Sequence, residues 1–97
     1  MISTHVLDTE HGQPGAGITV ALYHGKELIS LQETNEDGRI PDLTEGRSLD
    51  PGEYRLVFYV SSGFFERVET TIVVDPSERY HVPLLLSPYS CVIYRGS

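Results

Sequence analysis

Apolar and polar residues alternate along most of this chain, and that alternation is the feature that most limits its fold. Successive side chains of a β-strand point to opposite faces, so a period of two indicates strands with one buried face. Helical spacing is hard to find. The alternation therefore predicts an all-β protein, with strands in seven segments: residues 2–8, 17–24, 27–34, 53–61, 65–74, 79–87 and 90–96.

The same pattern predicts which side chains share a face within each segment. In the first segment Ile2, Thr4 and Val6 lie on one face, and in the third segment Ile29 and Leu31 share a face. The opposite faces carry Ser3, His5 and Leu7 in the first segment and Ser30 and Gln32 in the third.

Turn residues separate the predicted strands. Gly25 lies at the tip of a short hairpin, Asp37 and Gly38 form an Asp-Gly turn, and Pro51 and Gly52 form another turn. Turns spaced about 8–15 residues apart are typical of a β-sandwich. We therefore expect residues 1–97 to form a single sandwich domain of two sheets.

Charge and cysteine content exclude several functions. The formal net charge is −7 and Lys26 is the only lysine, which argues against binding to nucleic acid or to an anionic membrane. No apolar stretch approaches the roughly 20 residues that span a bilayer. Cys91 is the only cysteine, so no intrachain disulfide is expected. The first residues lack the pattern of a signal peptide. We expect a soluble cytoplasmic protein.

A few polar residues stand at unusual places. His5 lies mid-strand, and His81 precedes Pro83, which cannot donate a backbone hydrogen bond and so marks an edge strand or a local break. Arg39 follows Gly38 at the exit of the Asp-Gly turn. Taken singly, a strand histidine is more often structural than catalytic, and a turn arginine is usually a surface charge.

The other two histidines carry weaker signals. His11 lies in a loop rich in Gly and Pro, and His24 lies beside a hairpin tip, so both are expected to be exposed. The histidines show no spacing typical of a metal site, and glycine-rich phosphate loops are absent. We therefore expect neither a metal nor a cofactor.

Several stretches, taken together, resemble one known family. The sequences "STHVLDTEHGQPGAGI" (3–18), "TNEDGRI" (34–40), "PGEYRLVF" (51–58), "YHVPLLLSP" (80–88) and the terminal "YRGS" look like those of the 5-hydroxyisourate hydrolases. These are transthyretin-like enzymes of urate degradation. The terminal "YRGS" is the most specific part, because it separates the enzymes from the transthyretin hormone carriers of the same fold.

The resemblance implies a fold, an assembly and an activity. The fold would be the transthyretin-like (prealbumin-like) two-sheet sandwich of seven to eight strands. The assembly would be a homotetramer, a dimer of dimers with active sites at the dimer–dimer interface. The substrate would be 5-hydroxyisourate, whose ring opens when water attacks a ring amide carbonyl. The family's site residues would fall on His5, Arg39 and His81 and on the terminal Tyr94, Arg95, Gly96 and Ser97.

Chemical roles for these residues follow from the reaction that the resemblance implies. Either His81 or His5 would accept a proton from water, while the other would polarise or protonate the substrate. Arg39 and Arg95 would bind the oxygens of the ring, and Ser97 would position water or substrate. Tyr94 and Gly96 would help to bind the substrate.

The chain departs from the family in one segment. Residues 57–70 run almost directly from strand to strand, so the short helix that the family has between its fifth and sixth strands is expected to be truncated or missing.

Two other functions fit the same sandwich. A non-enzymatic carrier would keep a pocket but would not need two histidines, an arginine and "YRGS" together. A structural β-sandwich module would share the turn-and-strand signals, but such modules usually form parts of secreted multidomain chains.

Overall fold

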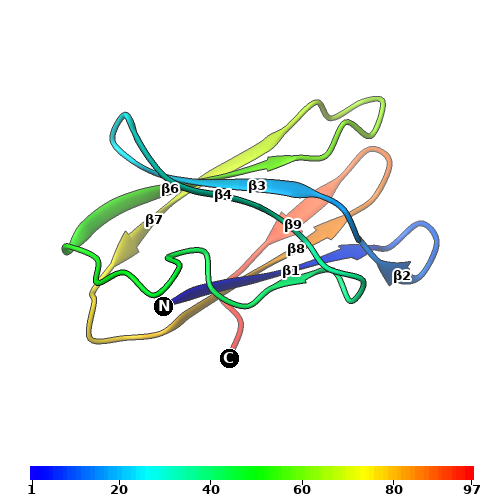
Figure 1. The fold of residues 1–97 in the computed structure, drawn as a ribbon. Helices are drawn as coiled ribbons and strands as arrows, with labels where there is room; N and C mark the ends of the chain where they lie inside the picture. Colours follow the sequence, from blue (N-terminus) through cyan, green and yellow to red (C-terminus); the bar gives the residue numbers. More distant parts are fainter.

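A computed structural model describes all of residues 1–97 as two packed β-sheets without an α-helix (Figure 1). Seven strands of three to eight residues lie where the alternation predicts them, and two further strands contain two residues each. No helix is present that could cross a membrane. The strands are β1 (Ile2–Asp8), β2 (Gln13–Pro14), β3 (Thr19–His24), β4 (Glu27–Glu33), β5 (Arg39–Ile40), β6 (Gly52–Tyr59), β7 (Val68–Val74), β8 (Tyr80–Leu86) and β9 (Cys91–Ile93).

The first sheet has the order β2-β1-β8-β9, and β5 also pairs with β1. Strands β1 and β8 run parallel, although they lie near opposite ends of the sequence. The second sheet has the order β4-β3-β6-β7 and is antiparallel throughout. Figure 1 shows the two sheets as stacked layers, with both chain termini at the same end of the sandwich. The predicted two-sheet sandwich is confirmed.

The core lies between the two sheets and follows the predicted face of the first segment. Ile2, Thr4 and Val6 of β1 are fully buried, as are Leu56 and Phe58 of β6. Burying a large apolar side chain contributes roughly 1.5–3 kcal/mol, so these residues hold the sheets together.

The predicted face of the third segment is wrong. Leu22 pairs with Ser30 and Tyr23 pairs with Leu28, so Ile29 is the extra residue of a β-bulge. A bulge changes the alternation of side chains by one residue. Ile29 and Ser30 are therefore both buried, whereas Leu31 is 57% exposed.

The expected exposure of His24 is also wrong. Its imidazole is only partly exposed and stacks on the ring of Tyr54, with the ring centroids 4.4 Å apart. His11 is exposed, as predicted.

Pro83 interrupts the pairing of β8 on one side. Strand β8 lies between β1 and β9, so it is not an edge strand. Its ladder with β9 covers only Leu84 to Leu86, and pairing resumes at a single bridge between His81 and Gly96. The predicted local break at Pro83 is confirmed.

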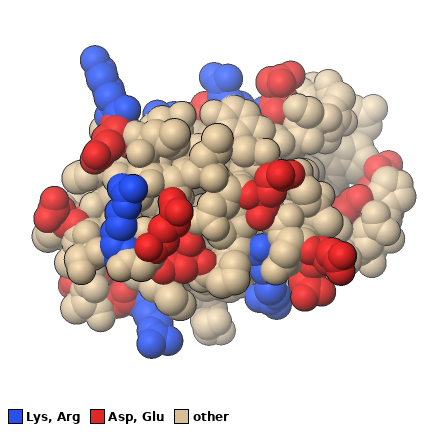
Figure 2. Space-filling model, viewed as in Figure 1, with Lys and Arg blue, Asp and Glu red and all other residues tan.

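Residues 60–67, between β6 and β7, contain no helix, as the shortened segment predicts. Charged side chains of both signs are interspersed on the face shown in Figure 2, where the blue basic groups form no continuous patch.

Candidate active site

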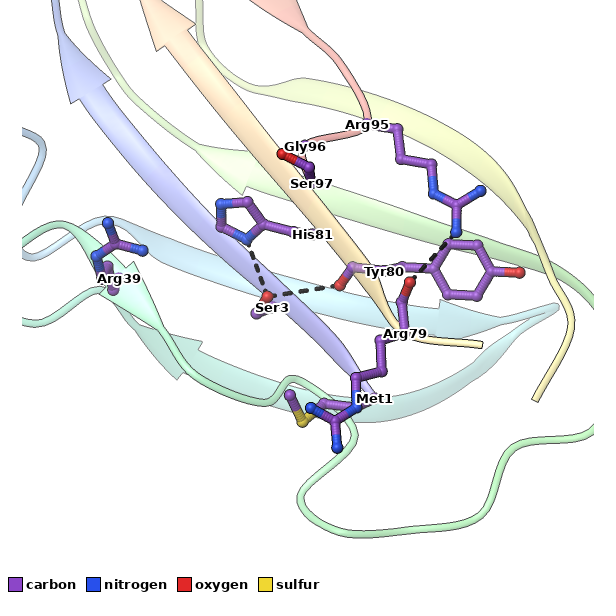
Figure 3. Close-up of a pocket in the computed structure, with 9 residues that line it drawn as sticks. All are labelled: Met1, Ser3, Arg39, Arg79, Tyr80, His81, Arg95, Gly96 and Ser97. Carbon is purple, nitrogen blue, oxygen red and sulfur yellow. Dashed lines mark hydrogen bonds between the residues drawn. The ribbon is translucent and has the colours of Figure 1, made fainter. Parts of the chain in front are cut away.

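A pocket of about 640 Å³ opens at the end of the first sheet where β1 and β8 begin (Figure 3). Two of its nine lining residues are hydrophobic. Two strands, one turn and the C-terminal tail supply the lining, which consists of Met1, Ser3, Arg39, Arg79, Tyr80, His81, Arg95, Gly96 and Ser97.

The parallel register of β1 and β8 places His81 in this pocket. Ser3 pairs with His81, and the Ser3 Oγ lies 2.9 Å from the His81 Nδ1. The fully buried Thr4 ties the same strands together, because its hydroxyl donates to the carbonyl oxygen of Val82 at 2.6 Å. The imidazole of His81 is thus held against β1 while one side of its ring faces the pocket (Figure 3).

The Asp-Gly turn brings Arg39 to the same pocket. The side-chain oxygen of Asn35 accepts hydrogen bonds from the backbone amides of Asp37 and Arg39, at 2.9 and 3.0 Å. Gly38 has a φ of 76°, and a Cβ there would overlap the carbonyl oxygen of Val6. Only glycine fits this position. The turn therefore fixes the place at which Arg39 pairs with β1.

The C-terminal tail is ordered against β8. The amide of Gly96 donates to the carbonyl oxygen of His81 at 2.7 Å. A Cβ at Gly96 would lie 2.7 Å from the His81 Cδ2, closer than carbon atoms pack. Gly96 thus lets the backbone approach the imidazole, and Ser97 follows directly at the pocket wall.

Arg95 anchors the tail on its other side. Its Nη2 lies 3.2 Å from the Glu78 Oε1 and donates to the carbonyl oxygen of Arg79 at 3.3 Å. Its guanidinium lies 4.6 Å from the centre of the Tyr80 ring, which is the geometry of a cation–π contact.

Two predicted site residues do not line the pocket. His5 lies on β1 opposite Arg39, and its Nε2 donates to the carbonyl oxygen of Asp37 at 2.9 Å. Tyr94 lines a neighbouring apolar groove of about 340 Å³ between the edges of the two sheets, together with Ile72 and Ile93. The predicted Arg39, His81, Arg95, Gly96 and Ser97 do share the pocket.

The environment of His81 lowers the pKa of its imidazole below the usual value of about 6.5. Partial burial is the largest cause, and the positive charges of Arg39 and His5 add to it. His81 is therefore neutral at pH 7 and can accept a proton, as a general base must.

Four lining residues were not predicted: Met1, Ser3, Arg79 and Tyr80. One feature of the sequence could have indicated Ser3, because it shares a strand face with the predicted site residue His5. A small polar residue on an outward face usually faces solvent, so the sequence alone gave it no chemical role. Nothing in the sequence separates Arg79 from other surface arginines.

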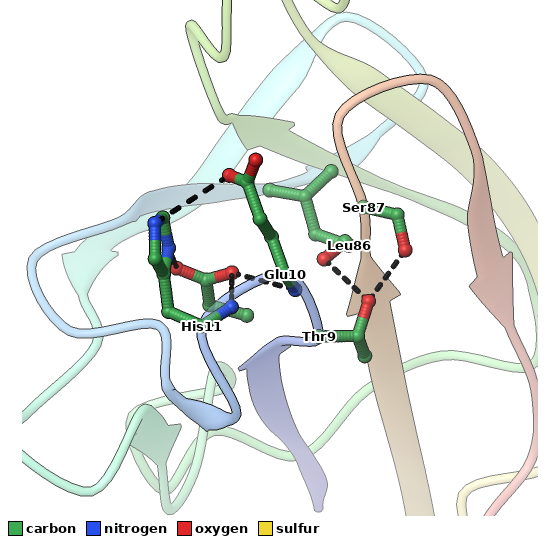
Figure 4. A network of polar contacts seen from close by, with 6 residues as sticks. Thr9, Glu10, His11, Leu86 and Ser87 are labelled. Atoms are coloured by element: carbon green, nitrogen blue, oxygen red, sulfur yellow. Dashed lines mark hydrogen bonds and ion pairs between the residues drawn. The ribbon is translucent and has the colours of Figure 1, made fainter.

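A second cluster of polar side chains lies at the far end of β1 (Figure 4). The Asp8 Oδ1 accepts hydrogen bonds from the backbone amides of Glu10 and His11, and its Oδ2 lies 2.8 Å from the His11 Nδ1. Thr9 and Ser87 join the loop to the end of β8 through a contact of 2.5 Å between their hydroxyl oxygens. These contacts close a turn on the surface.

The fold and pocket together define a two-sheet β-sandwich whose first sheet carries an imidazole-containing pocket. Residues 2–96 match the sequence profile of the HIUase/Transthyretin family. The chain belongs to this family.

Individual relatives agree with this assignment. The chain is 39% identical to the 5-hydroxyisourate hydrolase of Pseudomonas aeruginosa, over 99% of this chain and 90% of that protein. Among solved structures, the 5-hydroxyisourate hydrolase of Klebsiella pneumoniae superposes with a TM-score of 0.88 and 32% identity, over 99% of this chain and 98% of that one. Sea bream transthyretin in complex with thyroxine superposes with a TM-score of 0.87 at 23% identity, covering 98% and 93% of the two chains, and this likeness concerns the fold alone.

Proposed function

We propose that this protein is a 5-hydroxyisourate hydrolase, which opens the ring of its substrate by adding water at a ring amide carbonyl. Relatives that match nearly the whole chain carry this name. The observation that carries the proposal is the convergence of Arg39, His81 and Ser97, from a turn, a strand and the tail, in one pocket. The activity belongs to purine degradation.

In the proposed reaction, His81 accepts a proton from water as the water oxygen attacks the carbonyl carbon. The carbonyl π electrons move to its oxygen, and the guanidinium groups of Arg39 and Arg95 stabilise the negative charge that develops there. When the intermediate collapses, the carbon–nitrogen bond breaks and the leaving nitrogen takes the proton from His81. Ser97 positions the water or the substrate. The net change is the addition of one water molecule across the amide bond, with no covalent enzyme intermediate.

The geometry favours His81 over His5 as the base. The Nε2 of His5 donates to a backbone carbonyl, and His5 does not line the pocket. His81 lines the pocket, and its pKa is lowered. We assign His5 the supporting role, in which its contact with the turn before Arg39 helps to polarise the site.

A homotetramer in the cytoplasm is part of the proposal. The pocket lies at the outer face of the first sheet, where another subunit could cover it, and the exposed Val92 and Tyr94 lie on the neighbouring edge. Light scattering after size exclusion measures the mass directly, and four copies of the 10.8 kDa chain are expected.

The decisive test is a spectroscopic assay with freshly generated 5-hydroxyisourate, compared with its slow spontaneous decay in buffer. The purified protein should accelerate the disappearance of the substrate. His81→Ala should remove most of this rate while the assembly stays intact, and deletion of residues 94–97 should do the same. A wild-type protein that gives no acceleration would refute the proposal.

The same assay distinguishes a hydrolase from a carrier, because a carrier would bind the substrate without consuming it. The pocket argues for chemistry, since only Met1 and Tyr80 among its lining residues are hydrophobic. Titrating the protein with a stable purine analogue, alongside the turnover assay, distinguishes the two functions.

A further inference from the structure

The hydroxyl of Ser3 makes two contacts at the edge of the pocket. It lies 2.9 Å from the Nδ1 of His81, and it donates to the carbonyl oxygen of Tyr80 at 3.5 Å (Figure 3). Ser3 also faces His81 directly in the register of β1 and β8. The position of this hydroxyl is therefore set by two strands and not by side-chain rotation alone.

The 2.9 Å contact by itself allows either atom to donate, and one arrangement of protons makes both contacts hydrogen bonds. A carbonyl oxygen can only accept a hydrogen bond, so the single hydroxyl proton of Ser3 points to Tyr80. The lone pairs of the Ser3 Oγ then accept a proton from the His81 Nδ1. In a neutral imidazole only one nitrogen carries a proton, so the Nε2 of His81 holds a free lone pair.

Gly96 restricts the opposite edge of the same ring. The imidazole carbons on that edge, Cγ and Cδ2, lie against the backbone of Gly96, where a Cβ would come within 2.7 Å of Cδ2. Ser3 thus contacts the Nδ1 side of the ring, and Gly96 contacts the Cδ2 side. The Nε2, which neither residue contacts, faces the pocket. Figure 3 shows the second ring nitrogen on the side away from Ser3.

We propose that Ser3 is a positioning residue that fixes the tautomer of His81, holding the proton on Nδ1 so that Nε2 is the basic atom in the pocket. This inference rests on the proposed function, because a general base needs a free lone pair aimed at water. It goes further by naming the atom that accepts the proton and the residue that makes it available.

The proposal predicts different effects for two substitutions of Ser3. Ser3→Ala removes the acceptor for the Nδ1 proton, so the imidazole can place its proton on Nε2 and lose the basic lone pair there. We expect kcat/KM to fall roughly 10-fold or more, because a positioned general base contributes about 10²–10⁴-fold. Ser3→Thr keeps a hydroxyl at the same atom and should restore most of the rate. Ser62→Ala, an exposed serine between β6 and β7, is the matched control.

The tautomer itself can be read by ¹⁵N NMR of the full-length protein labelled at histidine, in which protonated and unprotonated ring nitrogens resonate far apart. The His81 signals are assigned by their absence from His81→Gln. At a pH where His81 is neutral, we expect a protonated Nδ1 and an unprotonated Nε2 in the wild type and in Ser3→Thr, and a shift toward protonated Nε2 in Ser3→Ala.

The NMR spectra test the role of Ser3, and the turnover assay tests the proposed function. A wild-type His81 with its proton on Nε2, or a Ser3→Ala tautomer that equals the wild type, would overturn the role of Ser3 even if the protein is a hydrolase. A wild type without hydrolase activity would refute the function, while the spectra would still report the tautomer. If Ser3→Ala folds poorly, the spectra of the wild type and of Ser3→Thr test the predicted tautomer of His81 without it.

Discussion

The backbone of Gly96 lies directly against the imidazole of His81, so that even one added carbon atom would collide with the ring at 2.7 Å. Gly96→Ala should therefore push the tail and the imidazole apart. A misplacement of about 1 Å at a reacting group can cost roughly 10²-fold in rate, so we expect a large loss of kcat/KM. The assay with 5-hydroxyisourate measures this loss of kcat/KM.

Gly46→Ala is the control for Gly96→Ala. Gly46 has a φ of 78° and open space around it, so alanine strains the backbone without touching the pocket. It should lower the melting temperature and leave the activity of the folded protein unchanged. Equal activities of the two variants would show that the close contact at Gly96 has no role in the site.

Removing the side chain of Arg95 should affect activity more than stability. Its ion pair with Glu78 is exposed, and such pairs contribute at most about 1 kcal/mol. We expect Arg95→Ala to keep its unfolding midpoint in urea but to lose roughly 10-fold or more in kcat/KM, because the guanidinium stabilises the oxyanion. Arg67→Ala, which breaks a similar exposed pair with Glu69, should leave activity unchanged. A fully active Arg95→Ala would remove this guanidinium from the mechanism.

The activity should rise with pH through the lowered pKa of His81. Only the neutral imidazole acts as a base, so the acid limb of kcat/KM should lie below the ordinary histidine value of about 6.5. Arg39→Gln removes a nearby positive charge, which makes protonation easier and raises the pKa of His81. An NMR titration of the His81 ring follows this shift independently of the rate. A pKa that stays constant or falls in Arg39→Gln would contradict the electrostatic explanation.

The same lowered pKa makes stability depend on pH. Between the folded and unfolded pKa values of His81, the unfolded chain binds more protons than the folded protein, so this group destabilises the fold as pH falls below about 6.5. His81→Gln should weaken that dependence, as measured by the free energy of unfolding in urea across this range.

Thr4→Val should loosen the pairing of the strands that carry Ser3 and His81. The Thr4 hydroxyl is fully buried and donates to the carbonyl oxygen of Val82, so valine leaves this acceptor without that hydrogen bond. A loss of about 1–3 kcal/mol in the free energy of unfolding is expected. Thr71→Val, at an exposed position of β7, should change it by no more than about 0.5 kcal/mol. Urea denaturation of both variants measures the difference.

The turn at Asp8 should be most ordered in a window of mildly acidic pH. The hydrogen bond with His11 lowers the pKa of Asp8 and raises the pKa of His11. The contribution of His11 is fully present below about pH 6.5 and is lost as pH rises through its raised pKa. The contribution of Asp8 is present above about pH 4 and is lost as pH falls through its lowered pKa.

Amide exchange at Glu10 and His11, corrected for the intrinsic rates, measures the order of this turn. The turn at Asp75 is the matched control, because its carboxylate accepts the amide of Ser77 without a histidine partner. Protection there should not decline at higher pH. Protection at His11 that is the same above and below its pKa would contradict the role of the imidazole.

The sequence predicted the strands, and the buried face of the first, because burial on one side imposes a period of two. It failed where local geometry breaks that period. The bulge at Ile29 buries Ser30 and exposes Leu31, and the stacking of His24 on Tyr54 needs two strands in a known register. Strand order likewise depends on pairings between distant segments.

The site was predicted less completely than the fold. His81, Arg39 and the tail residues were predicted from the resemblance to a family. Their spacing along the chain gives no distance between them. Ser3 was missed because its importance lies in the partner that the parallel register places beside it. The proposed role of Ser3 depends on its hydrogen bond with His81, and no pattern along the sequence predicts that contact.

The parallel pairing of β1 with β8 also has a consequence for how the protein matures. Ser3 and His81 are separated by 78 positions, so the pocket cannot assemble until the chain beyond His81 has left the ribosome. Such high contact order slows folding, since distant segments must meet before their contacts repay the lost entropy. Until then the edge of β1 that pairs with β8 has no partner, and chaperones that shield extended segments would increase the yield of active enzyme.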